Sequence, residues 1–356
     1  MNSRERVVTV LKRGIPDRVP VDLSWGFSAP YRELFFQKTG QTDYMRYFGV
    51  DTEFANSANS KKPNDYSSYF GKQVEDALFS HDEWGIGHQK TPNGGHFSHI
   101  VSPLKNAETL NEILDYPLPD LDADYRLSAV QGNVEDIHQK SLAASAPLAC
   151  TLFETAWQIR GFEELIMDLL DENELSECLI DRIMAIREKQ IKAYVHAGAD
   201  VMMFGDDIGM QTGMMLSPNL WRTFFKPRMA KLIKTARIIN PDIPVFYHSD
   251  GDIREVIPDL IEIGVTVLNP VQPECMDPAE IKRLYGDKLA FWGSISVQQT
   301  LPFGTPEDVK NEVKLRMETI GKDGGFLIGP SHMIEPEVPW ENLLAFFEAV
   351  EKYGRY

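Results

Sequence analysis

The chain has 356 residues, of which 43% are hydrophobic and 25% are charged, values that are typical of a globular protein. Its formal net charge of −17 argues against a nucleic-acid partner, because an acidic surface repels phosphate backbones. No apolar run approaches the roughly 20 residues of a membrane-spanning helix, and the polar N-terminus lacks the pattern of a signal peptide. Three scattered cysteines cannot form a disulfide framework. We therefore expect a cytoplasmic protein that binds neither nucleic acid nor a membrane.

The first part of the chain predicts a helix and two strands ahead of an irregular region. Residues 3–11 have the start signal and apolar pattern of a short helix, which Gly14 ends. Residues 17–23 indicate a first buried strand, and residues 49–54 indicate a second. The stretch 65–105 is rich in aromatic residues, Gly and His, which favours β-hairpins in an insertion over the mouth of the fold. Aromatic surface there would suit a homodimer.

Short apolar strands alternate regularly with amphipathic helices from residue 147 onward. Strands are predicted at residues 148–152, 200–205, 243–248, 265–269, 289–294 and 326–330. Helix starts are indicated by Ser217-Pro218, Asp277-Pro278 and Thr305-Pro306, and helix ends by Gly264, Gly286 and Gly321.

Strands that alternate with helices in this way predict βαβ units and a parallel sheet. With the two strands upstream, the regular units make eight strands, and we predict a single (β/α)8 TIM-barrel domain. An elaborated part covers about residues 25–145, and the regular units cover 147–356. A doubly wound open sheet is the alternative fold. It would usually carry a Gly-rich phosphate loop after an early strand, which this sequence lacks.

Residues that directly follow barrel strands face the active site of such an enzyme. In this sequence those positions are rich in acidic, His and Cys residues rather than in the Gly, Ser and Asn of ordinary turns. The residues concerned are Glu154, Asp206, Asp207, His248, Asp250, Gln272, Cys275 and His332.

His248 and Asp250 are two residues apart at a strand end, so an extended backbone directs both side chains to the same side. His332 follows the last strand, and Cys275 lies between them in the chain. Imidazole, carboxylate and thiolate ligands suit Zn²⁺, and three ligands with an open position make a catalytic site. A hydrogen-bonded His–Asp pair without metal is the alternative, and Cys275 could equally be an ordinary loop thiol.

Asp206 and Asp207 form the second candidate group. Paired acids at a strand end can bind substrate NH groups or cations, or transfer protons, and we place both with Asp250 among the catalytic residues. The alternative is that one caps the next segment while the other bonds to a neighbouring loop. Glu154, Gln272 and Met210 are predicted to line the substrate pocket.

Several segments that are not specific alone carry a family resemblance in combination. They are Arg4-Glu5-Arg6-Val7, Pro16-Asp17-Arg18-Val19-Pro20-Val21, Gly205-Asp206-Asp207-Ile208-Gly209, His248-Ser249-Asp250-Gly251, Leu268-Asn269-Pro270-Val271-Gln272, Gly304-Thr305-Pro306-Glu307-Asp308-Val309, Pro330-Ser331-His332 and Pro339-Trp340-Glu341-Asn342. With them, nearly the whole chain resembles the uroporphyrinogen decarboxylase superfamily. That superfamily contains porphyrinogen decarboxylases and zinc-dependent, corrinoid-linked methyltransferases, and its fold is an α/β barrel.

The resemblance favours the methyltransferase-like branch. True decarboxylases hold the substrate carboxylates with an Arg-Gln-Ala-Gly-Arg segment, but residues 23–28 here contain no arginine to offset the desolvation of those carboxylates. In the methyltransferase branch, a His-x-Cys pair and a later Cys bind zinc. His248 matches the His, Asp250 stands where the first Cys would be, and His332 stands at or near the second.

The resemblance thus implies a zinc-dependent methyltransferase that acts with a methylated corrinoid protein and a thiol or similar small acceptor. A metal-independent carboxy-lyase that acts on a smaller acid is the alternative enzyme. A non-enzymatic binding protein on the same scaffold is the third possibility, but an idle site need not keep costly buried acids.

Overall fold

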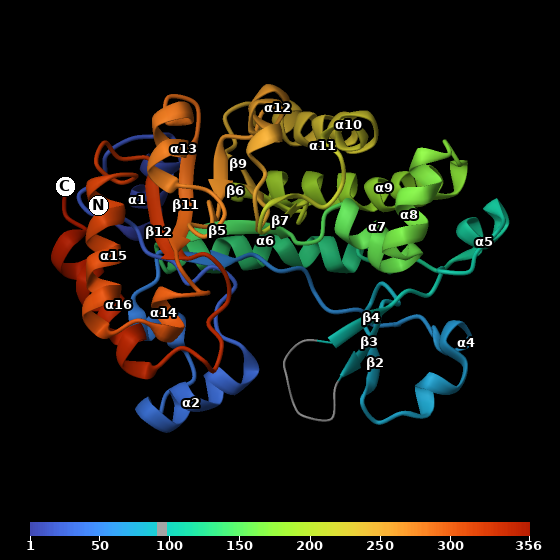
Figure 1. The fold of residues 1–356 in the computed structure, drawn as a ribbon, viewed down its shortest axis with the longest axis horizontal. Helices are drawn as coiled ribbons and strands as arrows, with labels where there is room; N and C mark the ends of the chain where they lie inside the picture. The colour runs from blue at the N-terminus through green and yellow to red at the C-terminus, as the bar shows by residue number, and fades with distance from the viewer. Residues whose placement is uncertain (91–97) are drawn as a thin grey trace.

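Seven parallel strands form one curled sheet in the computed structural model of the protein, which describes residues 1–90 and 98–356 (Figure 1). The strands, in their order across the sheet, are β1 (Thr52–Phe54), β5 (Ala143–Leu148), β6 (Val201–Gly205), β9 (Val245–His248), β10 (Val267–Asn269), β11 (Ala290–Ile295) and β12 (Phe326–Pro330). The order across the sheet follows the order in the chain, so each crossover leads to a neighbouring strand, as in an α/β barrel.

An extended segment at residues 20–22 occupies the place of the eighth strand. Val21 pairs in parallel with Ile328 of β12, and the Asp22 N–H donates to the Ile328 carbonyl at 3.0 Å. On its other side, the Asp51 N–H donates to the Val21 carbonyl at 2.9 Å, one residue before β1. The predicted strand at 17–23 is therefore present only as this short segment, because Pro20 has no N–H to give to a ladder.

Helices surround the sheet in the order that the alternation predicts (Figure 1). The helices around the barrel are α1 (Ser3–Leu11), α6 (Asp124–Gln139), α7 (Phe153–Arg160), α8 (Phe162–Leu170), α9 (Glu174–His196), α10 (Pro218–Leu220), a π-helical turn η2 (Trp221–Phe225), α11 (Lys226–Ile239), a 3-10 turn η3 (Arg254–Val256), α12 (Ile257–Ile263), α13 (Pro278–Tyr285), α14 (Thr300–Phe303), α15 (Pro306–Glu318) and α16 (Trp340–Tyr353). The helices of the N-terminal part are α2 (Ala29–Thr39), α3 (Tyr44–Phe48), α4 (Ser67–Phe70), the 3-10 turn η1 (Gly71–Glu75) and α5 (Leu110–Asp115).

Most of the predicted helix boundaries are confirmed. Ser217, Asp277 and Thr305 each accept a hydrogen bond from a backbone N–H of the first helical turn. Gly264 and Gly286 directly follow α12 and α13. Gly321 lies three residues beyond α15, and its N–H donates to the Arg316 carbonyl in the last turn of that helix at 2.9 Å.

The predicted strand at 148–152 is displaced. The strand is Ala143–Leu148, and residues 149–152 form the loop before α7. Residues 143–146 are Ala and Ser, which lack the β-branched and aromatic side chains that favour strands. The apolar Leu152, the last residue of the predicted strand, is instead buried directly before α7.

The predicted hairpins form a three-stranded antiparallel sheet of β2 (Phe79–His81), β3 (Gly87–Lys90) and β4 (Ser98–Val101), apart from the barrel sheet and next to α7 (Figure 1). The Leu104 N–H donates to the carbonyl of Ile159 in α7 at 2.9 Å, which attaches this insertion to the helix that follows β5. Residues 91–97 of the predicted region lie outside the described residues.

Within residues 65–90 and 98–105, aromatic side chains do not supply the exposed surface that was expected to suit a dimer. Tyr66 and Phe70 are buried, and Tyr69, Phe79 and Trp84 are partly buried and pack against the hydrophobic core. The homodimer stays a prediction.

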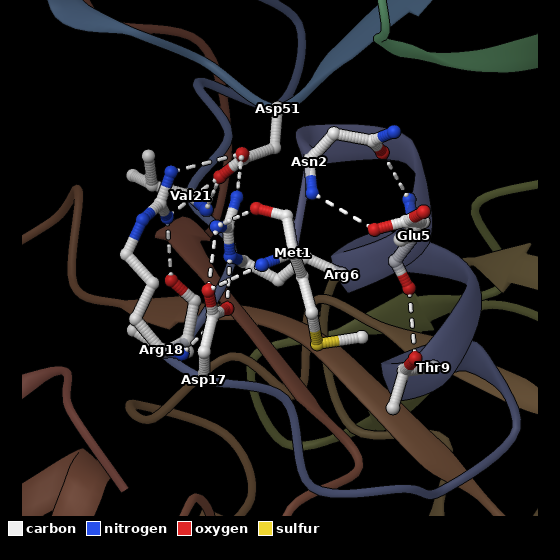
Figure 2. A network of polar contacts seen from close by, with 10 residues as sticks. Met1, Asn2, Glu5, Arg6, Thr9, Asp17, Arg18, Val21 and Asp51 are labelled. Atoms are coloured by element: carbon white, nitrogen blue, oxygen red, sulfur yellow. Dashed lines mark hydrogen bonds and ion pairs between the residues drawn. The ribbon is translucent and has the colours of Figure 1, made fainter.

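A cluster that we call the Asp51 clamp joins the N-terminal elements at the amino-terminal end of the barrel (Figure 2). The fully buried Asp51 carboxylate accepts hydrogen bonds from Arg6 at 3.1 Å, from Arg18 at 2.8 and 2.9 Å and from the Val21 N–H at 2.8 Å. Asp17 accepts a further bond from Arg6 at 2.8 Å. The clamp therefore fixes α1 and the extended segment at residues 20–22, here called the closing segment, to the start of β1.

Across the described residues, no helix combines the length and the apolarity that a membrane crossing requires.

Candidate active site

Three of the four predicted metal-ligating residues come together at the carboxyl-terminal edge of the sheet. His248 ends β9, Asp250 lies two residues beyond it, and His332 follows β12. One potential ligand atom from each lies within 4.8 Å of the other two. This His248–Asp250–His332 group forms because the carboxyl ends of parallel strands meet at one edge.

Hydrogen bonds fix the orientation of the buried His248 ring. Its Nδ1 lies 2.5 Å from the side-chain oxygen of Asn269, and the Asn269 amide nitrogen donates to the Trp292 carbonyl at 2.7 Å. Because that oxygen can only accept, Nδ1 is the donor in this contact, and Nε2 is the ring nitrogen that faces the site. Nε2 lies 3.5 Å from Asp207 and 4.0 Å from Asp250. A neutral imidazole held through its other nitrogen is the usual form of a metal ligand.

Asp250 has a buried oxygen, Oδ1, that accepts no hydrogen bond among the described residues. Burial raises the pKa of this carboxyl, while the neighbouring His248 opposes the shift. A buried carboxylate oxygen without a donor is costly, and a bound cation would satisfy it.

A hairpin of β7 (Gly209–Met210) and β8 (Gly213–Met214) fixes the backbone beside Asp250. Gly251 has φ +81°, and a Cβ there would lie 2.5 Å from the Gly209 carbonyl carbon and the Met210 nitrogen. The Asp252 N–H also donates to the Met210 carbonyl at 2.8 Å. Met210, predicted to line the pocket, is 51% exposed on this hairpin.

Asp206 and Asp207 have different roles. The fully buried Asp206 carboxylate accepts backbone N–H bonds from Leu152 at 3.2 Å and from Phe153 and Glu154 at 2.9 Å, so it caps α7. Burial raises the pKa of Asp206 to about 6. Asp207 instead lies beside His248, and its Oδ1 accepts the Asp250 N–H at 2.7 Å.

Glu154 borders Asp207 in the same part of the site. Its Oε2 accepts the Asp207 N–H at 2.9 Å, and its Oε1 accepts the Cys150 thiol at 3.6 Å. Burial, followed by the charges of Asp207 and Asp206, holds the pKa of Glu154 well above its usual range. The buried Gln272 accepts the Gly251 N–H at 3.1 Å and so shapes the Asp250 loop.

The structure leaves Cys275 outside the His248–Asp250–His332 group. Its thiol donates to the Gln211 side chain at 3.5 Å. Burial, with the charges of Glu274 and Asp250, raises the pKa of this thiol to about 11. Its place outside the group, rather than its acidity, separates Cys275 from the three predicted ligands.

Asn269, Trp25 and Asp22 belong to the site but were not predicted as functional residues. The Trp25 ring meets His248 edge-on with centroids 5.1 Å apart and stacks on Phe54. The buried Asp22 accepts the Trp292 indole N–H at 3.0 Å, and burial raises its pKa to about 6. The sequence did offer one signal for Asn269. It ends the predicted strand that follows the strand of His248, so both residues were expected at the same edge of the sheet.

A curled parallel sheet with acidic and His residues at its carboxyl edge defines the class of α/β-barrel enzymes. The profile of the uroporphyrinogen decarboxylase (URO-D) family matches residues 88–353, well over half of the chain. The protein belongs to this family, which confirms the resemblance seen in the sequence.

Relatives within the family catalyse two kinds of reaction. The chain is 23% identical over 365 residues to a uroporphyrinogen decarboxylase of Coxiella burnetii, covering 99% of this chain and 96% of the relative. It is 29% identical over 162 residues to the methylcobamide:CoM methyltransferase MtaA of Methanosarcina barkeri. That match spans 45% of this chain and 44% of the relative, less than half of each. Since these relatives are decarboxylases and methyltransferases, the protein is an enzyme.

A solved structure shows the same fold. A methyltransferase from Methanosarcina mazei superimposes with a TM-score of 0.69 at 17% identity, over 99% of both chains. This match confirms the predicted barrel.

Proposed function

We propose that the protein is a zinc-dependent methyltransferase that moves a methyl group from a methylated corrinoid protein to a thiol or a similar small acceptor. The observation that carries the proposal is the His248–Asp250–His332 group, whose ligand atoms lie within 4.8 Å of one another. The likeness to a methylcobamide:CoM methyltransferase supports the choice of methyl donor.

The residues present fit a zinc ion. Two imidazoles and one carboxylate are ligands that zinc accepts, and three protein ligands leave a position for an acceptor. Asn269 holds His248 with Nε2 facing the site, and Asp250 offers an oxygen without a donor. Bound zinc would lower the pKa of an acceptor thiol and so raise the fraction of thiolate at neutral pH.

The chain's own carboxylates would handle the proton. Asp207 lies beside Nε2 of His248, and we assign it as the group that takes the proton of the acceptor thiol. Glu154 would position Asp207, because its carboxylate accepts the Asp207 backbone N–H. The sulfur electron pair then forms the new S–CH₃ bond. The Co–CH₃ bond breaks with its electron pair left on cobalt, so cobalt is reduced from Co(III) to Co(I).

Asp250 replaces a sulfur ligand that the family resemblance implies. A carboxylate donates less electron density than a thiolate, which would leave zinc more Lewis acidic. We therefore expect an acceptor thiol to lose its proton readily but to attack the methyl group less readily. Because all three cysteines are free, we place the reaction in the reducing cytoplasm.

A metal-independent carboxy-lyase is the second candidate. It is favoured by the match to a uroporphyrinogen decarboxylase over 99% of this chain. In that reaction the partly buried acids Glu154 and Asp207 would supply the proton that replaces carbon dioxide. The substrate would be a smaller acid, because the chain lacks the arginine segment that holds many carboxylates.

Methyl transfer from free methylcobalamin to 2-mercaptoethanol tests the proposal. The purified, zinc-loaded protein should convert methylcobalamin in proportion to the methylated thiol formed, and chelation of zinc or the substitution His248→Ala should abolish the reaction. A zinc-loaded protein that transfers no methyl group, but whose chelated form releases carbon dioxide from a small acid, would overturn the proposal and support the lyase.

A further inference from the structure

The described loops that follow β5, β6, β9, β10, β11 and β12 contain no lysine or arginine. These loops are residues 149–152, 206–217, 249–253, 270–277, 296–299 and 331–339. Two arginines that lie beside these loops are bonded to other groups. Arg187 is buried and bonded to the Ala149, Cys150 and Thr151 carbonyls, and Arg254 pairs with Asp252.

Carboxylates dominate the charge at the same edge. The largest charged influences on Asp250 come from His248, Asp207, His332 and Glu274, and neither lysine nor arginine is among them. An anionic head group on the acceptor would therefore meet like charges in a partly desolvated site, where repulsion is poorly screened.

Glu274 is a carboxylate that the reaction proposed above does not use. It lies in the loop after β10, and one of its oxygens accepts the hydroxyl of Ser296, which follows β11. Its other oxygen, Oε2, is buried and has no hydrogen-bond partner among the described residues. The charge of Glu274 also acts on Asp250 and on Cys275, so it lies within electrostatic reach of the metal-ligating group.

We propose that the acceptor is a small thiol that carries a cationic amine, and that Glu274 is the residue that binds this amine. This inference rests on the proposed function. An ammonium group has three donors and no acceptor, which matches a buried carboxylate oxygen that lacks a donor. The methyl group moves from cobalt to the acceptor sulfur in the same way, and the amine neither forms nor breaks a bond.

Three acceptor thiols that share one carbon skeleton would show how the charge of the acceptor changes kcat/KM. Cysteamine, 2-mercaptoethanol and 2-mercaptoethanesulfonate share the HS–CH₂–CH₂ unit and carry an ammonium, a hydroxyl and a sulfonate. We expect kcat/KM to fall in that order, by at least about tenfold between the first and the last. Glu274→Gln should reduce the ratio of kcat/KM for cysteamine to kcat/KM for 2-mercaptoethanol by about tenfold. Glu280→Gln, on the exposed face of α13, makes the same change in net charge and should have no effect.

Binding of the methylated products gives a second readout that involves neither zinc chemistry nor thiol acidity. Calorimetry on the zinc-free protein should show tighter binding of 2-(methylthio)ethylamine than of 2-(methylthio)ethanol or 2-(methylthio)ethanesulfonate, and Glu274→Gln should remove the preference. Equal binding, or a preference for the sulfonate, would overturn the inference. Failure of the zinc-loaded protein to methylate any of the three thiols would instead overturn the proposed function, and the binding measurement would still decide the charge preference.

Discussion

At the scale of single residues, Asn269 determines how His248 is presented. The Asn269 side-chain oxygen accepts a hydrogen bond from His248 Nδ1. The Asn269 amide nitrogen donates to the Trp292 carbonyl, which orients the amide group. Asn269→Ala should weaken zinc binding about 10–100-fold, the usual effect of removing a group that orients a metal ligand. Competition with a coloured chelator would measure the loss.

Cys275→Ala is the matched control for that measurement. Because the thiol bonds to Gln211 and lies outside the metal-ligating group, its removal should leave zinc affinity unchanged. If Cys275→Ala lost as much zinc as His248→Ala, the thiol would be a ligand and the three-residue site would be incomplete.

Asp22 should make the stability of the fold depend on pH. Burial raises its pKa from 3.8 to about 6. The unfolded chain therefore loses this proton first, and stability falls as the pH rises from about 4 to about 6. In the wild-type protein, Asp22 should lower the free energy of unfolding by up to about 3 kcal/mol between about pH 4 and pH 6. Asp22→Asn should remove this contribution to the pH dependence of stability. Urea unfolding at both ends of the interval would show it, and equal slopes in the two proteins would contradict the assignment.

Some site residues could be read from the sequence and others could not. His248, Asp250 and His332 follow from strand ends and from the two-residue repeat of an extended chain, which are local properties. Asp206 and Asp207 look alike in the sequence because only the approach of α7 decides which one becomes a cap. The contact of Asn269 with His248 depends on the register between β9 and β10, which the sequence does not reveal.

At the scale of elements, the β7–β8 hairpin holds the Asp250 loop through a close approach of two glycines. Gly251→Ala would place a methyl group against the backbone of Gly209 and Met210. We expect displacement of Asp250 and a loss of zinc affinity of about tenfold or more. Gly198→Ala is a close control, since Gly198 has φ +85° but open space around it. Both variants should lose roughly 1 kcal/mol of stability from backbone strain, and only Gly251→Ala should lose zinc.

The strands that were predicted correctly are those rich in aromatic and branched side chains, such as β9 and β12. β5 was misplaced because its Ala and Ser residues are small, and burial against neighbours rather than propensity makes them a strand. The closing segment at 20–22 was overestimated in length, because its hydrogen bonds to β12 and to Asp51 depend on the whole barrel.

At the scale of the whole molecule, stability and chemistry lie at opposite ends of the barrel. The Asp51 clamp is at the amino-terminal end, and the metal-ligating group is at the carboxyl-terminal end. Asp51→Ala would leave Arg6 and Arg18 without their shared buried partner. We expect a loss of about 3–5 kcal/mol in the free energy of unfolding, the usual cost of breaking a buried ion pair. Denaturant unfolding would measure it, and zinc content at low temperature should stay at the wild-type value. A variant that kept its stability but lost zinc would contradict this separation.

Metal content is the measurement that tests the zinc site most directly. Plasma mass spectrometry on the wild-type protein after zinc reconstitution should find about one zinc per chain, as expected for one group of three protein ligands. His248→Ala should have lost it, and Cys275→Ala should have kept it. A wild-type protein that holds no zinc after reconstitution would contradict the metal site, leave His248 and Asp250 as an organic acid–base pair, and make the carboxy-lyase the better description of this enzyme.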